Sequence, residues 1–326
     1  MLCIHNTHTD PAFNIAAEEY FLKDRTEDFF LLWRSQRSII VGKHQNTYAE
    51  INLDFVRRHN IAVLRRLTGG GTVFHDPGNI NYTFIRNVPP GTGIDFERYT
   101  RPILDILQGL GVEARLTGRS DLTIGGFKFS GNAQYIYRNK VLHHGTMLFS
   151  AKILDLSEAL KVVPSRYEDK AIQSKRSQVT NIQEHLSEPI GILEFIDRVM
   201  DHVVSSDPAA DAYEFSRHDT VNINRYREEK YSTWEWNFGS SPPYSFSRTG
   251  QVDGKKVEIR LSVKGGRILT INLKGELISQ DTASFLAQAL MDKLHKPEVV
   301  LEVLQRLPSD IRMGRDTMEQ VARLMF

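Results

Sequence analysis

A glycine-rich stretch over residues 65–79, RRLTGGGTVFHDPGN, most constrains how this chain can fold. It follows an apolar run, 61–64, that is typical of a buried strand. Three adjacent glycines let main-chain N–H groups approach an anion closely, and the two arginines before them add fixed positive charge. The Asp-Pro-Gly at 76–78 is typical of a type II turn, and the strand expected at 79–85 alternates polar with apolar residues. The pattern predicts a phosphate-binding loop that leads into a polar pocket wall.

A flexible turn between two strands is the other interpretation of three glycines. No lysine followed by serine or threonine comes after them, so the stretch is not a P-loop. No Gly-x-Gly-x-x-Gly opens a helix, so it is not a dinucleotide fingerprint either. Composition and spacing therefore leave the ligand open.

The charge balance excludes several classes of function. The 326 residues carry 41 basic and 40 acidic side chains, so no overall field would attract nucleic acid or an anionic membrane. The single cysteine, Cys3, rules out an internal disulfide framework. The start lacks a basic segment followed by an apolar core, and no apolar run approaches the ~20 residues of a membrane span. We expect a cytoplasmic protein without nucleic-acid or membrane partners.

The first elements of the chain have clear patterns. Asp-Pro at 10–11 is typical of a helix start, and apolar residues recur after it at helical spacing. Glu18 and Glu19 are expected at the solvated side or edge of this helix. Apolar runs at 29–33 and 38–41 predict consecutive strands.

A hairpin with a Gly-Gly turn is expected over 121–131. Alternation places Lys128 and Ser130 on one face of its second strand, and Phe127 and Phe129 on the other. Two interpretations of Lys128 stay open: a lysine on the wet face of a hairpin, or a lysine inside a pocket that points at a phosphate or carboxylate.

A second hairpin, expected over 134–149, contains His143 and His144. Neighbouring residues of a strand point to opposite faces, so these two histidines are not expected to share a metal ion. No cluster of cysteine, histidine and carboxylate residues has zinc spacing. The polar loop 166–181 is poor in large apolar residues, which is typical of a mobile surface loop.

Together these stretches resemble the lipoate–protein ligases, relatives of the biotin–protein ligases. The resemblance is carried by GKHQN (42–46), RRLTGGGTVFHDPGN (65–79), KFSG (128–131), HGT (144–146), SKRSQVTN (174–181) and WEWNFG (234–239). It implies an α/β (α+β) fold with a mixed-sheet catalytic domain of the biotinyl/lipoyl-ligase type over 1–243. A small C-terminal αβ accessory domain would span 244–326. The family often has asparagine where this chain has Ser120, which leaves the role of Ser120 open.

The resemblance implies a role for each residue that matches a family motif. Lys128 matches the catalytic lysine. ATP or lipoyl-AMP would be bound by Arg65, Thr68, Gly69, Gly70, Gly71, Val73, Phe74, His75, Asn79, Lys128, Thr146, Ser174, Arg176 and Thr180. Lipoate would be bound by His44, Gly70, Gly71, Ser130, His144 and Gly145, and Asp121 would be a ligand of Mg²⁺. A purely structural, hydrogen-bonded His144 stays an alternative, and loop 166–181 would act as a lid over the adenylate.

The implied reaction uses ATP with Mg²⁺ to convert lipoate to lipoyl-AMP and then acylates a lysine of an apo lipoyl domain. Implied partners are lipoic acid or octanoate, the lipoyl domains of 2-oxoacid dehydrogenase acyltransferase subunits and the glycine-cleavage H protein. No tightly bound prosthetic group is expected. The alternatives are a lipoyltransferase that uses preformed lipoyl-AMP, an octanoyl transferase, a biotin ligase and a catalytically silent lipoyl-domain-binding protein. Cys3 lies outside every motif, which argues against the cysteine chemistry of an octanoyl transferase.

Overall fold

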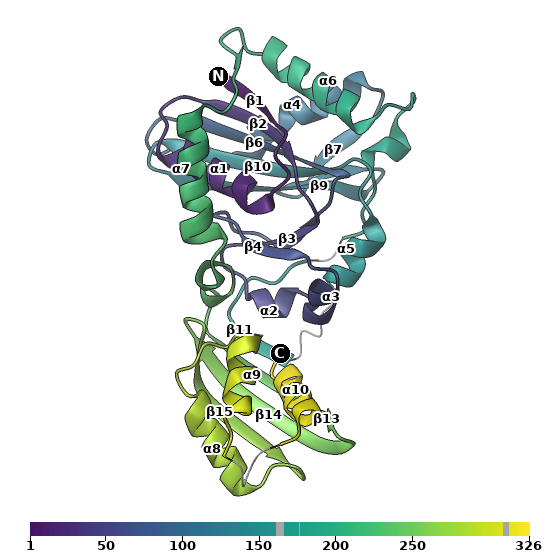
Figure 1. Cartoon of the computed structure of the whole chain (residues 1–326). Helices are drawn as coiled ribbons and strands as arrows, with labels where there is room; N and C mark the ends of the chain where they lie inside the picture. The colour runs from purple at the N-terminus through teal and green to yellow at the C-terminus, as the bar shows by residue number, and fades with distance from the viewer. Residues whose placement is uncertain (161–165, 176, 309–312) are drawn as a thin grey trace. The chain divides into compact units, whose positions relative to one another are not determined.

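The computed structural model describes residues 1–160, 166–175, 177–308 and 313–326, which form two compact α/β units (Figure 1). The first unit comprises the described residues of Met1–Lys43, Val56–Leu160 and Ser174–Thr233. The second comprises His44–Phe55, 166–173 and the described residues of Trp234–Phe326. The α/β class expected from the sequence is confirmed. Within the described part of the chain, no helix is both long and apolar enough to cross a membrane.

The first unit contains a mixed sheet with the strand order β12-β1-β2-β6-β10-β9-β8-β7. In chain order these are β1 (Leu2–Asn6), β2 (Phe29–Arg34), β6 (Asn79–Asn87), β7 (Ala114–Thr117), β8 (Asp121–Ile124), β9 (Phe127–Tyr137), β10 (Lys140–Leu148) and β12 (Asp211–Ala212). Strand β1 is parallel to β2 and β12, and the other pairs are antiparallel. The mixed sheet expected from the sequence is confirmed.

The two faces of this sheet differ in character. The core face packs against α4 (Phe96–Gly109) and α6 (Ile192–Ser205) in a large apolar cluster. The opposite, polar face presents Asn79, Asn81 and Thr83 from β6 together with His144 and Thr146 from β10. It is covered by α1 (Pro11–Lys23) and by a smaller sheet, so much of it is buried. Buried polar groups need hydrogen-bond partners, in the protein or in a ligand.

The smaller sheet has the order β4-β3-β5, with β3 (Ser38–Val41), β4 (Ala62–Arg65) and β5 (Val73–His75). The buried strand expected before the glycines is thus β4. The turn after β5 closes with a 3.0 Å hydrogen bond from Asn79 N to Asp76 O, but Gly78 does not have the positive φ of a type II turn. The expected turn type is wrong. Glycine is needed there because a Cβ on Gly78 would overlap the carbonyl of Ser150.

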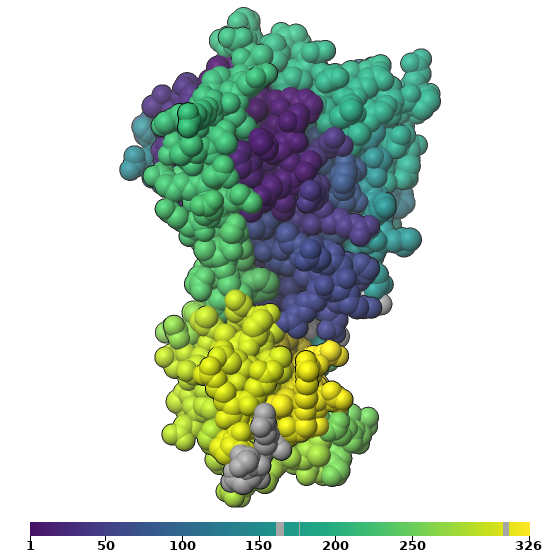
Figure 2. Space-filling model, in the orientation of Figure 1, coloured from purple at the N-terminus to yellow at the C-terminus, as the bar shows by residue number. Residues whose placement is uncertain are grey.

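Helix α1 begins as expected, with Asp10 accepting the N–H groups of the first turn. Every residue from Pro11 to Leu22 is buried, since α7 (Arg217–Tyr226) covers the side of α1 that faces away from the sheet. Figure 2 shows the N-terminal segment, in purple, beside the green segment that contains α7. Glu18 and Glu19 are 3% and 1% exposed, so the expectation of solvated glutamates is wrong.

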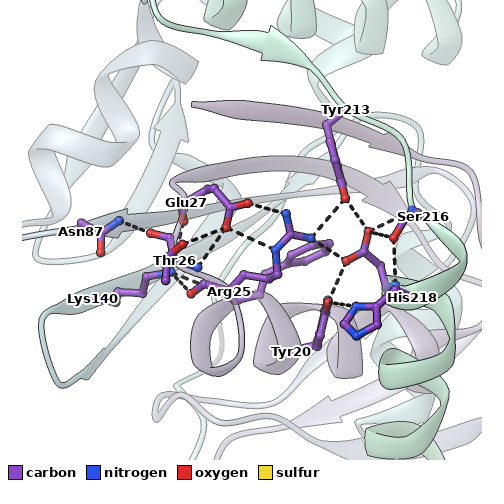
Figure 3. Close-up of polar contacts among 11 residues, drawn as sticks. Tyr20, Arg25, Thr26, Glu27, Asn87, Lys140, Tyr213, Ser216 and His218 are labelled. Atoms are coloured by element: carbon purple, nitrogen blue, oxygen red, sulfur yellow. Dashed lines mark hydrogen bonds and ion pairs between the residues drawn. The ribbon is translucent and has the colours of Figure 1, made fainter.

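A polar cluster ties the end of α1 to the start of α7 (Figure 3). Its centre is the carboxylate of Asp219, which has no exposed surface. It accepts hydrogen bonds from Tyr20, Tyr213 and Ser216 at 2.6–2.7 Å and pairs with Arg25 at 2.6 Å. Segments that are far apart in the sequence are therefore held together by one buried carboxylate.

The second unit is built on an antiparallel sheet with the order β11-β13-β14-β15. Its strands are β11 (Tyr167–Asp169), β13 (Tyr244–Val252), β14 (Lys255–Lys264) and β15 (Arg267–Gly275), and α8 (Gln280–Leu290), α9 (Pro297–Gln305) and α10 (Arg315–Leu324) pack on it. The remaining helices among the described residues are α2 (Thr47–Glu50), α3 (Leu53–Arg58), α5 (Ile153–Ala159), a 3₁₀ turn at Ile182–His185 and π turns at Arg227–Tyr231 and Glu235–Gly239.

Candidate functional site

The glycine loop after β4 is shaped by two buried arginines. Arg65 has no exposed surface, and its Nη1 donates to the carbonyls of Gly42 and Lys43 at 3.0 and 3.2 Å. Arg66 Nη2 donates to the carbonyls of Gly69 and Gly71 at 2.7 and 2.8 Å. Because Arg66 binds loop carbonyls, it fixes the path of the glycine loop without using the loop's N–H groups, whereas Arg65 fixes the segment after β3.

Both arginines keep their charge at neutral pH. Burial, with a smaller contribution from the neighbouring guanidinium, lowers the pKa of Arg65 to about 10. Burial also lowers the pKa of Arg66 to about 10, against the opposing effect of Glu18. Two buried cations beside a loop of glycines favour the binding of an anion.

A hydrogen-bond chain connects this loop to the polar face. His144 Nε2 lies 2.8 Å from Thr68 Oγ1, which also accepts the Nε–H of Arg66 at 2.8 Å. On its other side, His144 Nδ1 lies 3.0 Å from both carboxylate oxygens of Glu18. Glu18 also accepts the hydroxyl of Thr83 at 2.6 Å. The carboxylate therefore orients the imidazole, which in turn contacts the threonine of the glycine loop.

Lys128 lies on the polar side of the sheet because of a β-bulge. Leu122 pairs with Ser130 and Thr123 with Lys128, so Phe129 is an extra residue on β9. Residues paired across antiparallel strands share a face, which places Ser130 on the core face and Lys128 on the opposite one. The expectation that Lys128 and Ser130 share a face is wrong, because simple alternation does not count the extra residue.

The Lys128 side chain lies on this side of the sheet, beside Asp121 of β8. Its Nζ lies 2.8 Å from Asp121 Oδ1, and a Cβ on Gly131 would approach Nζ to 3.1 Å. The N–H of Gly131 donates to Thr146 Oγ1 at 3.2 Å. Glycine at position 131 therefore leaves room for the lysine beside the predicted site residue Thr146.

The segment 174–181 contacts both the glycine loop and the lysine strand. Ser174 Oγ accepts the N–H of Thr72 at 2.8 Å. The carbonyl of Lys128 accepts the N–H of Thr180 at 3.0 Å. The N–H of Lys128 donates to the carbonyl of Gln178 at 2.9 Å. Main-chain hydrogen bonds on both sides of Lys128 thus hold the end of the predicted lid.

Several buried polar atoms lack hydrogen-bond partners among the described residues. Four of them lie on facing parts of the two sheets: both ring nitrogens of His75, Oδ1 of Asn79 and Nδ2 of Asn81. Burial, helped by Arg66 and His144, lowers the pKa of His75 to about 3, so the imidazole is neutral. Unpartnered buried groups in a native structure require an explanation, and a bound polar ligand is one.

Three other predicted residues point away from this polar site. Phe74 lies on β5 between Val73 and His75, so its side chain points to the opposite face of the small sheet. Ser130 and Gly145 lie on the core face of the large sheet. His44 belongs to the second unit, and Arg176 lies outside the described residues.

Gly145 has a structural reason to be glycine. A Cβ there would overlap Asn132 Oδ1 and lie 2.6 Å from the ring of Tyr82. We predict that Gly145→Ala lowers the free energy of unfolding by about 1–3 kcal/mol, as overpacking of a filled core does. Chemical denaturation measures it, and Gly191→Ala, where a Cβ meets nothing within 4 Å, is the control. Equal stability of the two variants would contradict this packing.

A single carboxylate, Asp121, stands beside Lys128. Among the described residues, no group of three or more histidine, cysteine, aspartate or glutamate side chains could hold a metal ion. Mg²⁺ commonly binds through one or two carboxylates together with substrate phosphates, so one aspartate fits a magnesium–nucleotide complex. The assignment of Asp121 as a magnesium ligand stays a prediction.

The sequence did not reveal Glu18 or Arg66 as functional candidates. Glu18 lies on a helix that is buried on all sides. A carboxylate in such a helix requires a hydrogen-bonding or charged partner, so the lack of a polar face was the available signal. The sequence indicated only that Arg66 adds positive charge beside the glycines. Its hydrogen bonds to the loop carbonyls are visible only in the folded structure.

The chain matches two protein-family models. The "Lipoyl protein ligase A/B catalytic domain" covers residues 10–204, and the "Bacterial lipoate protein ligase C-terminus" covers residues 241–325. Lipoate–protein ligase 1 of Staphylococcus aureus is 37% identical, over 98% of each chain. Lipoate-protein ligase LplJ of Bacillus subtilis is 34% identical, over 100% of each chain.

Solved structures show the same fold. P. falciparum LipL1, in complex with lipoate, has a TM-score of 0.63 at 22% identity and covers 99% of this chain and 98% of its own. A lipoate-protein ligase A bound with ATP has a TM-score of 0.59 at 23% identity, over 73% of this chain and 98% of its own. With the two family models spanning most of the sequence, the chain belongs to the lipoate–protein ligase family.

Proposed function

We propose that this enzyme activates lipoate with ATP and transfers the lipoyl group to a lysine of an apo lipoyl domain. The observation that carries the proposal is the set of unpartnered polar atoms of His75, Asn79 and Asn81, buried between two sheets that also supply Lys128 and the glycine loop. This is a neutral hydrogen-bonding surface next to fixed positive charge, which suits a nucleotide joined to an acyl group. Relatives whose structures contain lipoate or ATP support the same ligands.

In the first step, a lipoate carboxylate oxygen attacks the α-phosphorus of ATP and pyrophosphate leaves. The N–H groups of Gly69, Gly70 and Gly71 bind phosphate oxygens, and buried Arg65 adds positive potential. Lys128 bridges the acyl and phosphoryl oxygens and stabilises the charge that develops on them. Asp121 would hold the magnesium that accompanies ATP, and that metal would supply charge neutralisation for the departing pyrophosphate.

In the second step, the ε-amine of the acceptor lysine attacks the carbonyl of lipoyl-AMP and AMP leaves. His144 binds the acyl part, and Glu18 fixes its ring. Thr146, Ser174 and Thr180 line the nucleotide side.

We further propose a catalytic domain over 1–243 and an accessory domain over 244–326, supported by the two family models. The acceptors would be the lipoyl domains of 2-oxoacid dehydrogenase complexes and the glycine-cleavage H protein. The structural analysis of an archaeal lipoylation system concerns a bi-partite lipoate protein ligase and its E2 lipoyl domain from Thermoplasma acidophilum, which supports this class of partner. A cytoplasmic location is part of the proposal.

The properties of Cys3 argue against an octanoyl transferase. Cys3 is 3% exposed within the apolar core, and burial raises the pKa of its thiol to about 11. A thiol that is buried and protonated cannot serve as the acyl-accepting nucleophile.

One assay tests the proposed function. The enzyme is incubated with ATP, Mg²⁺, lipoate and an apo lipoyl domain, and the acceptor is weighed by mass spectrometry. The expected result is the mass of one lipoyl group on one lysine, together with lipoate-dependent exchange of pyrophosphate into ATP. Transfer from supplied lipoyl-AMP without exchange would instead identify a transferase, and no transfer at all a binding protein.

Residues 167–169 form β11, so the expectation of a loop over all of 166–181 is wrong there, and we predict that the rest of this segment becomes less accessible when lipoyl-AMP forms. Its exposed Lys170 and Lys175 are accessible to trypsin in the free enzyme, whereas closure over the adenylate excludes water and protease. Limited proteolysis should show slower cleavage with lipoate plus ATP than with ATP alone. Equal cleavage in both conditions would rule out a lid.

A further inference from the structure

The side chain of Asn132 connects three parts of the core face behind Lys128. The hydroxyl of buried Tyr82 donates a short hydrogen bond to Asn132 Oδ1. The Nδ2 of Asn132 donates to the carbonyl of Ser120 at 2.9 Å and to Ser130 Oγ at 3.2 Å. The amide thus joins strands β6 and β9 to the residue that directly precedes β8.

The carbonyl of Ser120 receives two hydrogen bonds from one residue. Both the main-chain N–H and the side-chain Nδ2 of Asn132 donate to it, each at 2.9 Å. Ser120 directly precedes Asp121, the first residue of β8, and Asp121 Oδ1 lies 2.8 Å from Lys128 Nζ. The backbone that carries this carboxylate is therefore fixed from the opposite side of the sheet.

The surroundings leave this arrangement little freedom. Burial raises the pKa of Tyr82 far above its usual value, so its hydroxyl stays protonated and donates. Gly145 lies opposite Asn132 on β10, and any side chain there would occupy the space of both Asn132 and Tyr82. The missing Cβ of Gly145 thus allows the phenol and the amide to meet.

We propose that Asn132 is a positioning residue for adenylation. It holds the Ser120 carbonyl and thereby the Asp121 carboxylate, which sets the position of Lys128 Nζ. Asn132 itself lies on the core face and does not touch the polar site. The function of Ser120 is then carried by its main-chain carbonyl and does not depend on which side chain stands at this position. The inference rests on the proposed function, because its consequence is the rate of lipoyl-AMP formation.

Lipoate-dependent pyrophosphate exchange by the full chain tests the inference with Asn132→Asp. The variant keeps the shape of the side chain but replaces the donating NH₂ with an oxygen that repels the Ser120 carbonyl. A misplacement of about 1 Å can cost about 10² in rate, so we expect kcat to fall about 10- to 100-fold. The KM values for ATP and lipoate should change less than about twofold, since the glycine loop, Arg65 and the polar face that bind the substrates stay in place.

Gln134→Glu is the matched control. Gln134 lies two residues further along β9, on the same face, and its Nε2 bonds the carbonyl of Asp95 and the ring of His143 instead. The same amide-to-carboxylate change there should leave kcat within about twofold of the wild type. If Asn132→Asp does not fold, Asn132→Ala replaces it, because alanine introduces no charge.

A double-mutant cycle with Asp121→Asn shows whether the effect passes through the aspartate. Residues that act as a unit are not additive, so the double variant should be no slower than the slower single variant. Rate losses that multiply would overturn the inference. So would an Asn132→Asp enzyme with a lower melting temperature but normal kcat, since that is a structural role only. Absence of exchange in the wild type would overturn the proposed function as well.

Discussion

Replacing Lys128 with alanine is expected to abolish adenylation while the fold stays intact. Its ammonium group is a preorganised positive charge, held 2.8 Å from Asp121 Oδ1 on the polar side of the sheet. Removing one such charge-stabilising donor typically costs about 10²–10³ in rate. Lipoate-dependent pyrophosphate exchange measures the loss, and circular dichroism checks the fold.

Lys128→Arg should fail as well. A planar guanidinium does not replace a compact ammonium in the narrow space above Gly131. Arg115→Ala, at an exposed position on the nearby edge strand β7, is the matched control and should keep its activity. Near-normal exchange by Lys128→Ala would mean that this lysine is a solvated residue of the hairpin without a role in adenylation. That is the other interpretation left open by the sequence.

The second large effect is expected from Asp219→Ala, this time on stability. Asp219 has no exposed surface, and its removal leaves Arg25 without its 2.6 Å partner and three hydroxyls without an acceptor. Breaking a buried pair by removing one member typically costs about 3–5 kcal/mol. Differential scanning calorimetry should show a marked fall in melting temperature. Asp105→Asn, an exposed carboxylate 4.0 Å from Arg101, should show almost none.

The contribution of Asp219 should depend on pH in a defined direction. Burial alone would raise its pKa, but hydrogen bonds from Tyr213, Ser216 and Tyr20 lower it to about 2. The unfolded value is about 3.9, so the stabilisation is complete above about pH 4 and is lost as the pH falls towards 2. The difference in melting temperature between wild type and Asp219→Asn should therefore shrink below about pH 4. A constant difference across that range would contradict the assigned pKa.

Local patterns predicted much of the fold. Asp10 caps the first helix as expected, the strand 38–41 has the bounds predicted for it, and both glycines of the hairpin turn before Phe127 have positive φ. These features depend on interactions between residues close in sequence, such as capping, alternation and turn geometry. The motifs predicted the family of this chain, and the matching family model and relatives confirm it.

The faces of the strands and the burial of charges depended on more distant contacts. A bulge at Phe129 reversed the side on which Lys128 lies, and no local signal marks an extra residue in a ladder, because the partner strand defines it. Glu18 is buried against the large sheet, where it contacts Thr83 and His144, and Glu19 is buried against the turn at Arg227–Tyr231, about two hundred residues later. Gly78 was expected to provide the positive φ of a type II turn. Glycine is instead required there because a Cβ would overlap the carbonyl of Ser150.

The sequence by itself determined the elements, the family and the residue types of the site. Side-chain periodicity, caps and motifs are properties of short segments, and they act before any long-range packing exists. Only the tertiary structure decided which polar groups meet: His144 with Glu18 and Thr68, and Lys128 with Asp121. The physical reason is that a buried charge or hydrogen-bonding group requires a partner, and that partner can come from any distance along the chain.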